Sequence, residues 1–111
     1  MDIQTRTENN AIVITVSGRL DTITATDYEK KIRALIENGD IYLVVDFEQL
    51  DYISSAGLRG LLVMYKLLNA KGGKACLANV NLNVQSIFDM CGLSSVFKIK
   101  NSVAEALIAI T

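Results

Sequence analysis

The order of hydrophobic and polar positions divides the chain into short strands and helices. Residues 1–6 and 11–18 alternate between apolar and polar side chains, which is typical of strands with one covered face. Turn-forming residues in "TENN" separate them, so we expect a hairpin whose first strand lies at a sheet edge. Residues 41–47, "IYLVVDF", are almost continuously apolar, which predicts a central strand that is covered on both sides.

Apolar residues at helical spacing predict four helices. Two longer ones cover residues 24–39 and about 56–71, and each ends at glycine, Gly39 in the first and the pair 72–73 in the second. Their apolar stripes are Tyr28, Ile32, Leu35 and Ile36, then Leu58, Leu61, Leu62, Tyr65 and Leu68. Two shorter helices are expected over residues 82–92, stopped by Gly92, and over 102–110, capped by Ser102.

The alternation of strands and helices predicts an α/β fold with a mixed five-stranded sheet and about four helices. Strands over residues 74–80 and 96–100 complete the sheet, and residues 48–53 are expected to be a loop. Strand–helix–strand units pair their strands in parallel with right-handed crossovers. If every crossover steps in the same direction, the helices lie mainly on one face and leave the other thinly covered. The length of 111 residues predicts one domain, residues 1–111.

The amino-acid composition excludes several classes of function. The chain has no histidine, which excludes Ser-His-Asp and Cys-His catalysis and histidine zinc ligands. Cys76 and Cys91 lack a CxxC spacing, so we expect two free thiols, at least one of them buried. A net charge of −1 without a Lys/Arg cluster argues against nucleic acid as a partner. No signal peptide or membrane span is visible, so we expect a cytoplasmic protein without membrane insertion.

Two adjacent serines, Ser54 and Ser55, precede the second long helix. Either could simply cap the helix. A helix N-terminus also offers unpaired N–H groups and the positive end of the helix dipole, so it tolerates a phosphate. The two roles are compatible, since one serine can cap while the other stays exposed.

Three segments resemble one family in order and spacing, namely "GRLDTITATDYEKKI", "LVVDFEQLDYISSAGLRGLL" and "IFDMCGL". They are similar to the STAS domain of bacterial anti-sigma factor antagonists, and the resemblance covers the whole chain. It implies a partner-switching regulator of transcription that binds an anti-sigma factor, itself a serine kinase, and so releases a sigma factor. It also implies phosphorylation of a serine at the start of the second helix, reversed by a serine phosphatase.

The family's typical site reads Asp, Ser, Ser or Thr, Gly, Leu. Aligned on Gly57 and Leu58, the resemblance places the phosphorylated residue at Ser55. This chain departs from the pattern with Ser54 at the aspartate position and Ala56 at the second hydroxyl position. Ser54 is therefore the second choice for the acceptor.

The predicted partner-binding residues surround this serine: Asp21, Ser54, Ala56, Gly57, Leu58 and Arg59. Gly57 could leave room for a kinase to reach the hydroxyl, or could merely be tolerated in the first helical turn. Asp21 follows the second strand and should lie at the same sheet edge as the serines. It could contact the partner or cap the next helix, a role that Thr22 or Thr24 could also fill.

Asp46 ends the third strand and invites comparison with receiver domains, but the acidic pair that they need is missing. We expect Asp46 to be a turn or hydrogen-bonding residue. Phe88 and Met90 are expected to face the core or to pack at the helix end, and Asp89 to lie at the surface.

Two other classes of function, a transport subunit and an enzyme, are alternatives to the antagonist. The chain also resembles the free-standing STAS subunits of ABC-type lipid transport complexes, and this resemblance implies a structural or regulatory interaction module as the alternative function. An enzyme with Ser55 as nucleophile would need a base and a GxSxG elbow, and neither is present. We therefore expect a binding protein rather than an enzyme, a monomer or weak dimer without cofactor or metal.

Overall fold

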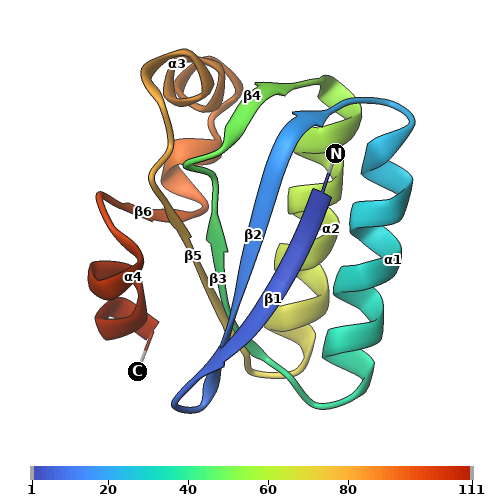
Figure 1. The fold of residues 1–111 in the computed structure, drawn as a ribbon, viewed down its shortest axis with the longest axis vertical. Coiled ribbons are helices and arrows are strands. Elements are labelled where there is room, and N and C mark those ends of the chain that lie inside the picture. Colours follow the sequence, from blue (N-terminus) through green and yellow to red (C-terminus); the bar gives the residue numbers. More distant parts are fainter. Residues whose placement is uncertain (1, 111) are drawn as a thin grey trace.

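The strands form one mixed sheet in which the hairpin lies at an edge. A computed structural model describes residues 2–110. The sheet has the order β1-β2-β3-β5-β6, with β1–β2 antiparallel and the other neighbours parallel (Figure 1). The bounds are β1 (Asp2–Glu8), β2 (Ala11–Leu20), β3 (Tyr42–Asp46), β5 (Lys74–Ala78) and β6 (Lys98–Lys100). The edge position of β1 and the central position of β3 are confirmed, whereas Met1 lies outside the described residues.

A sixth strand, β4 (Leu50–Ile53), lies where a loop was predicted. It pairs in parallel with the end of β2, Gly18 with Leu50 and Arg19 with Tyr52, so the register shifts between Gly18 and Arg19. Gly18 has a φ of 89°, a conformation that costs glycine little, so the shift falls where the chain can bend. The prediction of a loop was wrong because β4 is buried only at its two ends and lacks the alternation typical of a strand.

Within residues 2–110, four helices accompany the sheet: α1 (Thr24–Glu37), α2 (Ser55–Ala70), α3 (Leu82–Cys91) and α4 (Val103–Ile110), with a short 3-10 turn, η1 (Leu93–Ser95). The larger core joins α1, α2 and α3 to one face of the sheet. Residues that the three helices and the sheet contribute to it include Tyr28, Ile32, Leu61, Met64, Phe88, Ile14, Leu43, Val45 and Leu77. The expectation that the helices lie mainly on one face is therefore confirmed.

The exception is α4, which covers the opposite face (Figure 1). Its Ala106 and Ile110 pack against a second buried cluster that includes Val44 of β3 and Cys76 of β5. Because α4 follows the last strand and is not a crossover, the handedness rule does not assign it a face. It gives β3 cover on both sides, as predicted.

Gly92 and Ser102 cap their helices as predicted. Gly92 ends α3 with a φ of 76°, and the Ser102 hydroxyl accepts a hydrogen bond from the Glu105 N–H at 3.1 Å. Phe88 is buried as predicted, but Met90 is 84% exposed, so the prediction that it faces the core or packs at the helix end was wrong. Two positions after Phe88, Met90 falls on the other side of α3.

Both cysteines are free thiols; Cys76 is buried and Cys91 is exposed. Burial raises the pKa of the Cys76 thiol. Among residues 2–110, no helix is long and apolar enough to cross a membrane.

Candidate functional site

The two serines at the start of α2 have different environments. Ser54 is the extended N-cap residue, and its hydroxyl accepts a hydrogen bond from the Gly57 N–H at 3.2 Å. Its own N–H donates to the Leu20 carbonyl at 2.9 Å, which ties the start of α2 to the end of β2. Ser55 is the first helical residue, it is exposed, and its hydroxyl makes no hydrogen bond within residues 2–110. Ser54 therefore caps the helix, while the Ser55 hydroxyl is accessible.

The surroundings of Ser55 favour an added negative charge. The first turn of α2 contains no acidic residue, so the positive end of the helix dipole is not neutralised within the helix. Arg59 is exposed and follows Ser55 by one helical turn, the spacing at which side chains on a helix surface meet. An anion on Ser55 would therefore lie near a cation and near unpaired N–H groups.

The Asp21 carboxylate caps the N-terminus of α1. One carboxylate oxygen, Oδ1, accepts hydrogen bonds from the N–H groups of Ile23 and Thr24, both at 3.0 Å. The Thr24 N–H is the main cause that holds the pKa of Asp21 below its ordinary value, and Arg19 contributes by its charge. Of the residues expected to compete for this cap, Asp21 therefore fills the role. Its contact with a partner stays a prediction.

Gly57 has a role that neither predicted alternative describes. It is buried, and the Cβ of any other residue would meet Ile53 Cγ1 and the Leu20 carbonyl oxygen, both at 2.8 Å. Glycine here lets α2 approach the ends of β2 and β4. Gly57 is thus a buried packing position, and its place on the partner-binding surface stays a prediction.

The other predicted residues differ in exposure. Ala56 and Leu58 are half-buried and pack against the larger core, whereas Ser55 and Arg59 are exposed. Asp21 lies one residue beyond Leu20, which contacts Ser54 and borders Gly57. The structure therefore brings the loop after β2 and the start of α2 together.

One pair at this edge was not found from the sequence. The Arg19 guanidinium lies 4.2 Å from the centre of the Tyr52 ring, and both side chains are exposed. Such a contact is worth about 0.5–1 kcal/mol at an exposed site. No local signal could have revealed it, because the contact depends on the pairing of β2 with β4 beyond the register shift.

Asp46 and Asp89, the two other acidic residues considered in the sequence, both accept hydrogen bonds. Asp46 is 8% exposed, and its Oδ1 accepts from the Glu48 N–H at 3.1 Å and from Asn79 Nδ2 at 3.0 Å. This confirms the hydrogen-bonding role expected for Asp46. Asp89 is exposed, as predicted, and accepts from the Ser94 and Gln85 side chains. Within residues 2–110, no group of three or more His, Cys, Asp or Glu side chains could hold a metal ion.

Comparisons with known proteins agree with this architecture. The STAS domain family model matches residues 2–106. The Bordetella bronchiseptica protein BtrV is 32% identical over 91 residues, which cover 82% of this chain and 78% of that protein. An anti-sigma F factor antagonist of Paenibacillus polymyxa is 29% identical over 110 residues, which cover 96% of this chain and 94% of that protein.

Solved structures share the fold. A Thermotoga maritima protein superimposes with a TM-score of 0.93 at 16% identity, over 97% of this chain and 93% of that chain. The phosphorylated form of the Bacillus cell fate determinant SpoIIAA superimposes with a TM-score of 0.79 at 23% identity, over 99% of this chain and 100% of that chain.

Proposed function

This chain belongs to the STAS domain family, and from that premise we propose that it is a bacterial anti-sigma factor antagonist controlled by phosphorylation of Ser55. In the unmodified form it binds an anti-sigma factor that is also a serine kinase, and a sigma factor is released. The kinase phosphorylates Ser55 and the complex dissociates, after which a serine phosphatase restores the binding form. The chain thus acts by binding and not by catalysis. The names of its relatives support the antagonist role.

The observation that carries this proposal is the division of roles between the two serines. Ser55 is exposed at the first position of α2, whereas the Ser54 hydroxyl is engaged by the Gly57 N–H. A kinase can reach Ser55 without disturbing the helix cap. Phosphorylation of Ser54 would replace a cap worth about 1 kcal/mol. Ser55 is therefore the preferred acceptor and Ser54 the second choice.

The same geometry explains how modification could control binding without unfolding the domain. A phosphate adds about −1.5 to −2 charges at neutral pH. The start of α2 tolerates this charge, because it has no acidic residue in its first turn and has Arg59 one turn later. A partner docked over Ser55 would have to desolvate the charge, which costs several kcal/mol when it is unpaired. Each 1.4 kcal/mol lowers affinity about tenfold.

The test is a reconstitution with the kinase purified from the same cell. The kinase is identified as the ATPase that co-purifies with the full chain. We expect Ser55→Ala to bind it, to accept no phosphate and to stay bound when ATP is added. Ser55→Glu should bind at least about tenfold more weakly and keep the melting temperature of the wild type. Ser95→Ala, at an exposed serine elsewhere, is the matched control and should behave as the wild type.

Each part of the proposal can fail separately. If Ser55→Ala accepts phosphate as readily as the wild type, the acceptor is another residue, and Ser54→Ala is examined next. If Ser55→Glu binds the kinase with undiminished affinity, charge does not control the complex. If the chain co-purifies instead with an ABC-type transporter, the transport-subunit function replaces the antagonist function.

A further inference from the structure

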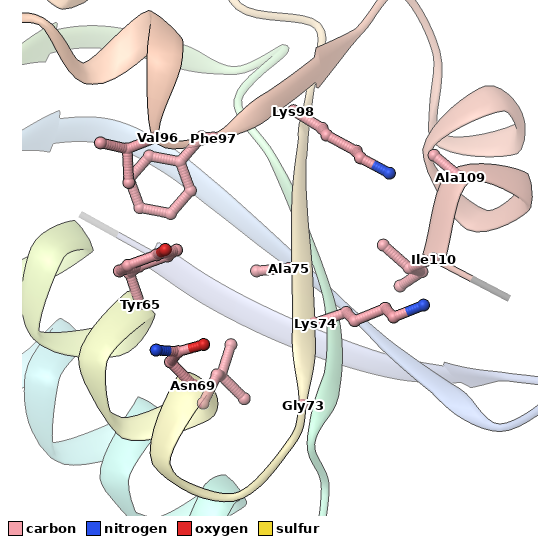
Figure 2. Close-up of a pocket in the computed structure, with 11 residues that line it drawn as sticks. Tyr65, Asn69, Gly73, Lys74, Ala75, Val96, Phe97, Lys98, Ala109 and Ile110 are labelled. Carbon is pink, nitrogen blue, oxygen red and sulfur yellow. The ribbon is translucent and has the colours of Figure 1, made fainter.

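A groove of about 240 Å³ lies at the β6 edge of the sheet, beside the second half of α2. Its walls come from α2, from the segment before β6 and from α4 (Figure 2). On the α2 side the rings of Tyr65 and Phe97 meet edge to face, with their centres 5.8 Å apart. The groove is independent of the serines at the other end of α2.

The floor of the groove is a stretch of β5 that β6 does not reach. Pairing between β5 and β6 begins at Cys76 and Lys98, so within residues 2–110 no strand pairs with Lys74 and Ala75 on that side. This free edge is much shorter than the roughly five to six residues of a typical strand. An added peptide strand would gain little there. The volume is also below the roughly 300–1,000 Å³ of pockets for drug-sized ligands, so the groove fits a small molecule.

Among residues 2–110, the charged side chains that line the groove are both positive. Lys74 and Lys98 line it, both are exposed, and neither forms an ion pair within residues 2–110. Figure 2 shows their ammonium groups on the α4 side of β5, whereas Tyr65 and Phe97 lie on the opposite side. No acidic residue is among the described residues that line the groove. A ligand across the sheet edge would therefore meet cations at one end and aromatic rings at the other.

From this arrangement we propose that the groove binds a small organic carboxylate with an apolar body. The carboxylate pairs with Lys74 and Lys98, and the body crosses the edge at Ala75 to lie against Tyr65 and Phe97. Lysine ammonium groups bind carboxylates through charge-assisted hydrogen bonds. The aromatic side of the groove buries the apolar body of the ligand. A hydrophilic anion has no such body and would gain no free energy from this burial.

The experiment compares two probes that differ only at the polar end, phenylbutyrate and phenylbutanol. Both are titrated into the 15N-labelled protein, and amide shifts in the NMR spectrum report the site and the affinity. We expect phenylbutyrate to shift the amides of Ala75, Phe97 and Ala109, and phenylbutanol to bind at least about tenfold more weakly. Equal affinity of the two probes, or no shift of these amides at about 10 mM, would overturn the proposal.

Matched variants test the two lysines. In the double variant Lys74→Gln with Lys98→Gln, phenylbutyrate should lose its advantage over phenylbutanol, and the affinity for phenylbutanol should stay unchanged. Lys66→Gln, at an exposed lysine of α2 outside the groove, should bind phenylbutyrate as the wild type does. If the double variant binds phenylbutyrate with wild-type affinity, the lysines do not recognise the carboxylate and the proposal is wrong. Unchanged amide spectra without probe establish that each variant is folded.

Discussion

At the residue scale, two glycines of α2 have different neighbours although they are only one helical turn apart. A Cβ on Gly57 would meet Ile53 and the Leu20 carbonyl at 2.8 Å. On Gly60 it would lie 3.4 Å from the Tyr28 ring and 3.5 Å from the Glu29 side chain, which is close to ordinary contact. Glycine is therefore required at position 57, because α2 approaches the strand ends closely there. At position 60 there is room for a Cβ, so glycine is not required.

We predict that alanine destabilises the fold at Gly57 but not at Gly60. Gly57→Ala should lower the free energy of unfolding by about 1–3 kcal/mol, because the core is overpacked. Gly60→Ala should leave it unchanged or raise it by up to about 1 kcal/mol, because alanine favours the helix. Urea unfolding of both variants measures the difference. Equal stability of the two variants would contradict the assigned packing of Gly57.

A second prediction at the residue scale concerns how the stabilisation by Asp21 depends on pH. Hydrogen bonds hold its pKa below the ordinary value, so its ionised form stabilises the fold at neutral pH. This stabilisation is complete above the ordinary pKa of aspartate in the unfolded chain, about 4. It is lost as the pH falls from there through the lowered pKa of the folded state. Asp21→Asn keeps a capping side chain but does not titrate. The stability advantage of the wild type over Asp21→Asn should therefore shrink between pH 7 and pH 3.

Urea midpoints at the two pH values check this prediction. Asp51→Asn, which removes one carboxylate at an exposed position of β4, serves as the control. A constant difference between the wild type and Asp21→Asn at both pH values would show that the cap does not depend on ionisation.

How far the site could be predicted depends on how local its signals are. The serine pair could be placed at the start of α2, since capping depends on a few neighbouring residues. The burial of Gly57 could not, because its neighbours Leu20 and Ile53 reach it from two different strands. The contact of Arg19 with Tyr52 was missed for the same reason.

At the element scale, α4 is the helix whose position was least determined by sequence pattern. The longer helices α1 and α2 have continuous apolar stripes and connect parallel strands, so both their existence and their face follow from general rules. α4 has eight residues and is not a crossover between two of the described strands. Its side chains nevertheless differ clearly in exposure, since Ile110 is 3% exposed and Ile108 is 76% exposed.

We predict that these two isoleucines differ strongly in their effect on docking of α4. Ile110→Ala should lower the free energy of unfolding by about 2–5 kcal/mol, as expected for a buried isoleucine. It should also speed the reaction of Cys76 with a thiol reagent, since Cys76 lies in the cluster that α4 covers. Ile108→Ala should change both quantities little.

The measurement is made in a Cys91→Ser background, because Cys91 is exposed and would react first. Denaturation should make Cys76 fully reactive in every variant without prior reduction. If Ile108→Ala speeds the Cys76 reaction as much as Ile110→Ala, α4 does not dock through the face that contains Ile110.

At the scale of the whole molecule, the sheet is best protected at its centre. β3 lies between β2 and β5, and α4 covers the face that α1, α2 and α3 leave open (Figure 1). Leu43, Val44 and Val45 are fully buried. β1 has one neighbour and is exposed along most of its length. Protection from solvent should therefore decrease from the centre of the sheet to the hairpin edge.

We predict that this order appears in hydrogen exchange. The hydrogen-bonded amides of β3 should exchange at least about tenfold more slowly than those amides of β1 that point to β2, because the edge opens without unfolding the core. Native-state exchange followed by NMR measures both sets in one sample. Protection in β1 equal to that in β3 would mean that the hairpin and the core open as one unit.

The length of β2 has a practical consequence for measuring complexes of this protein. The strand has ten residues, so at about 3.3 Å per residue its two ends lie about 30 Å apart. One end joins the hairpin turn at Asn9 and Asn10, and the other, Leu20, is hydrogen-bonded to Ser54. A fluorophore attached at Asn10, through a cysteine placed there in a chain without Cys91, would be several Debye lengths from Ser55 at physiological salt. Its rotational anisotropy would report when a second protein binds, while the dye itself stays clear of the serines.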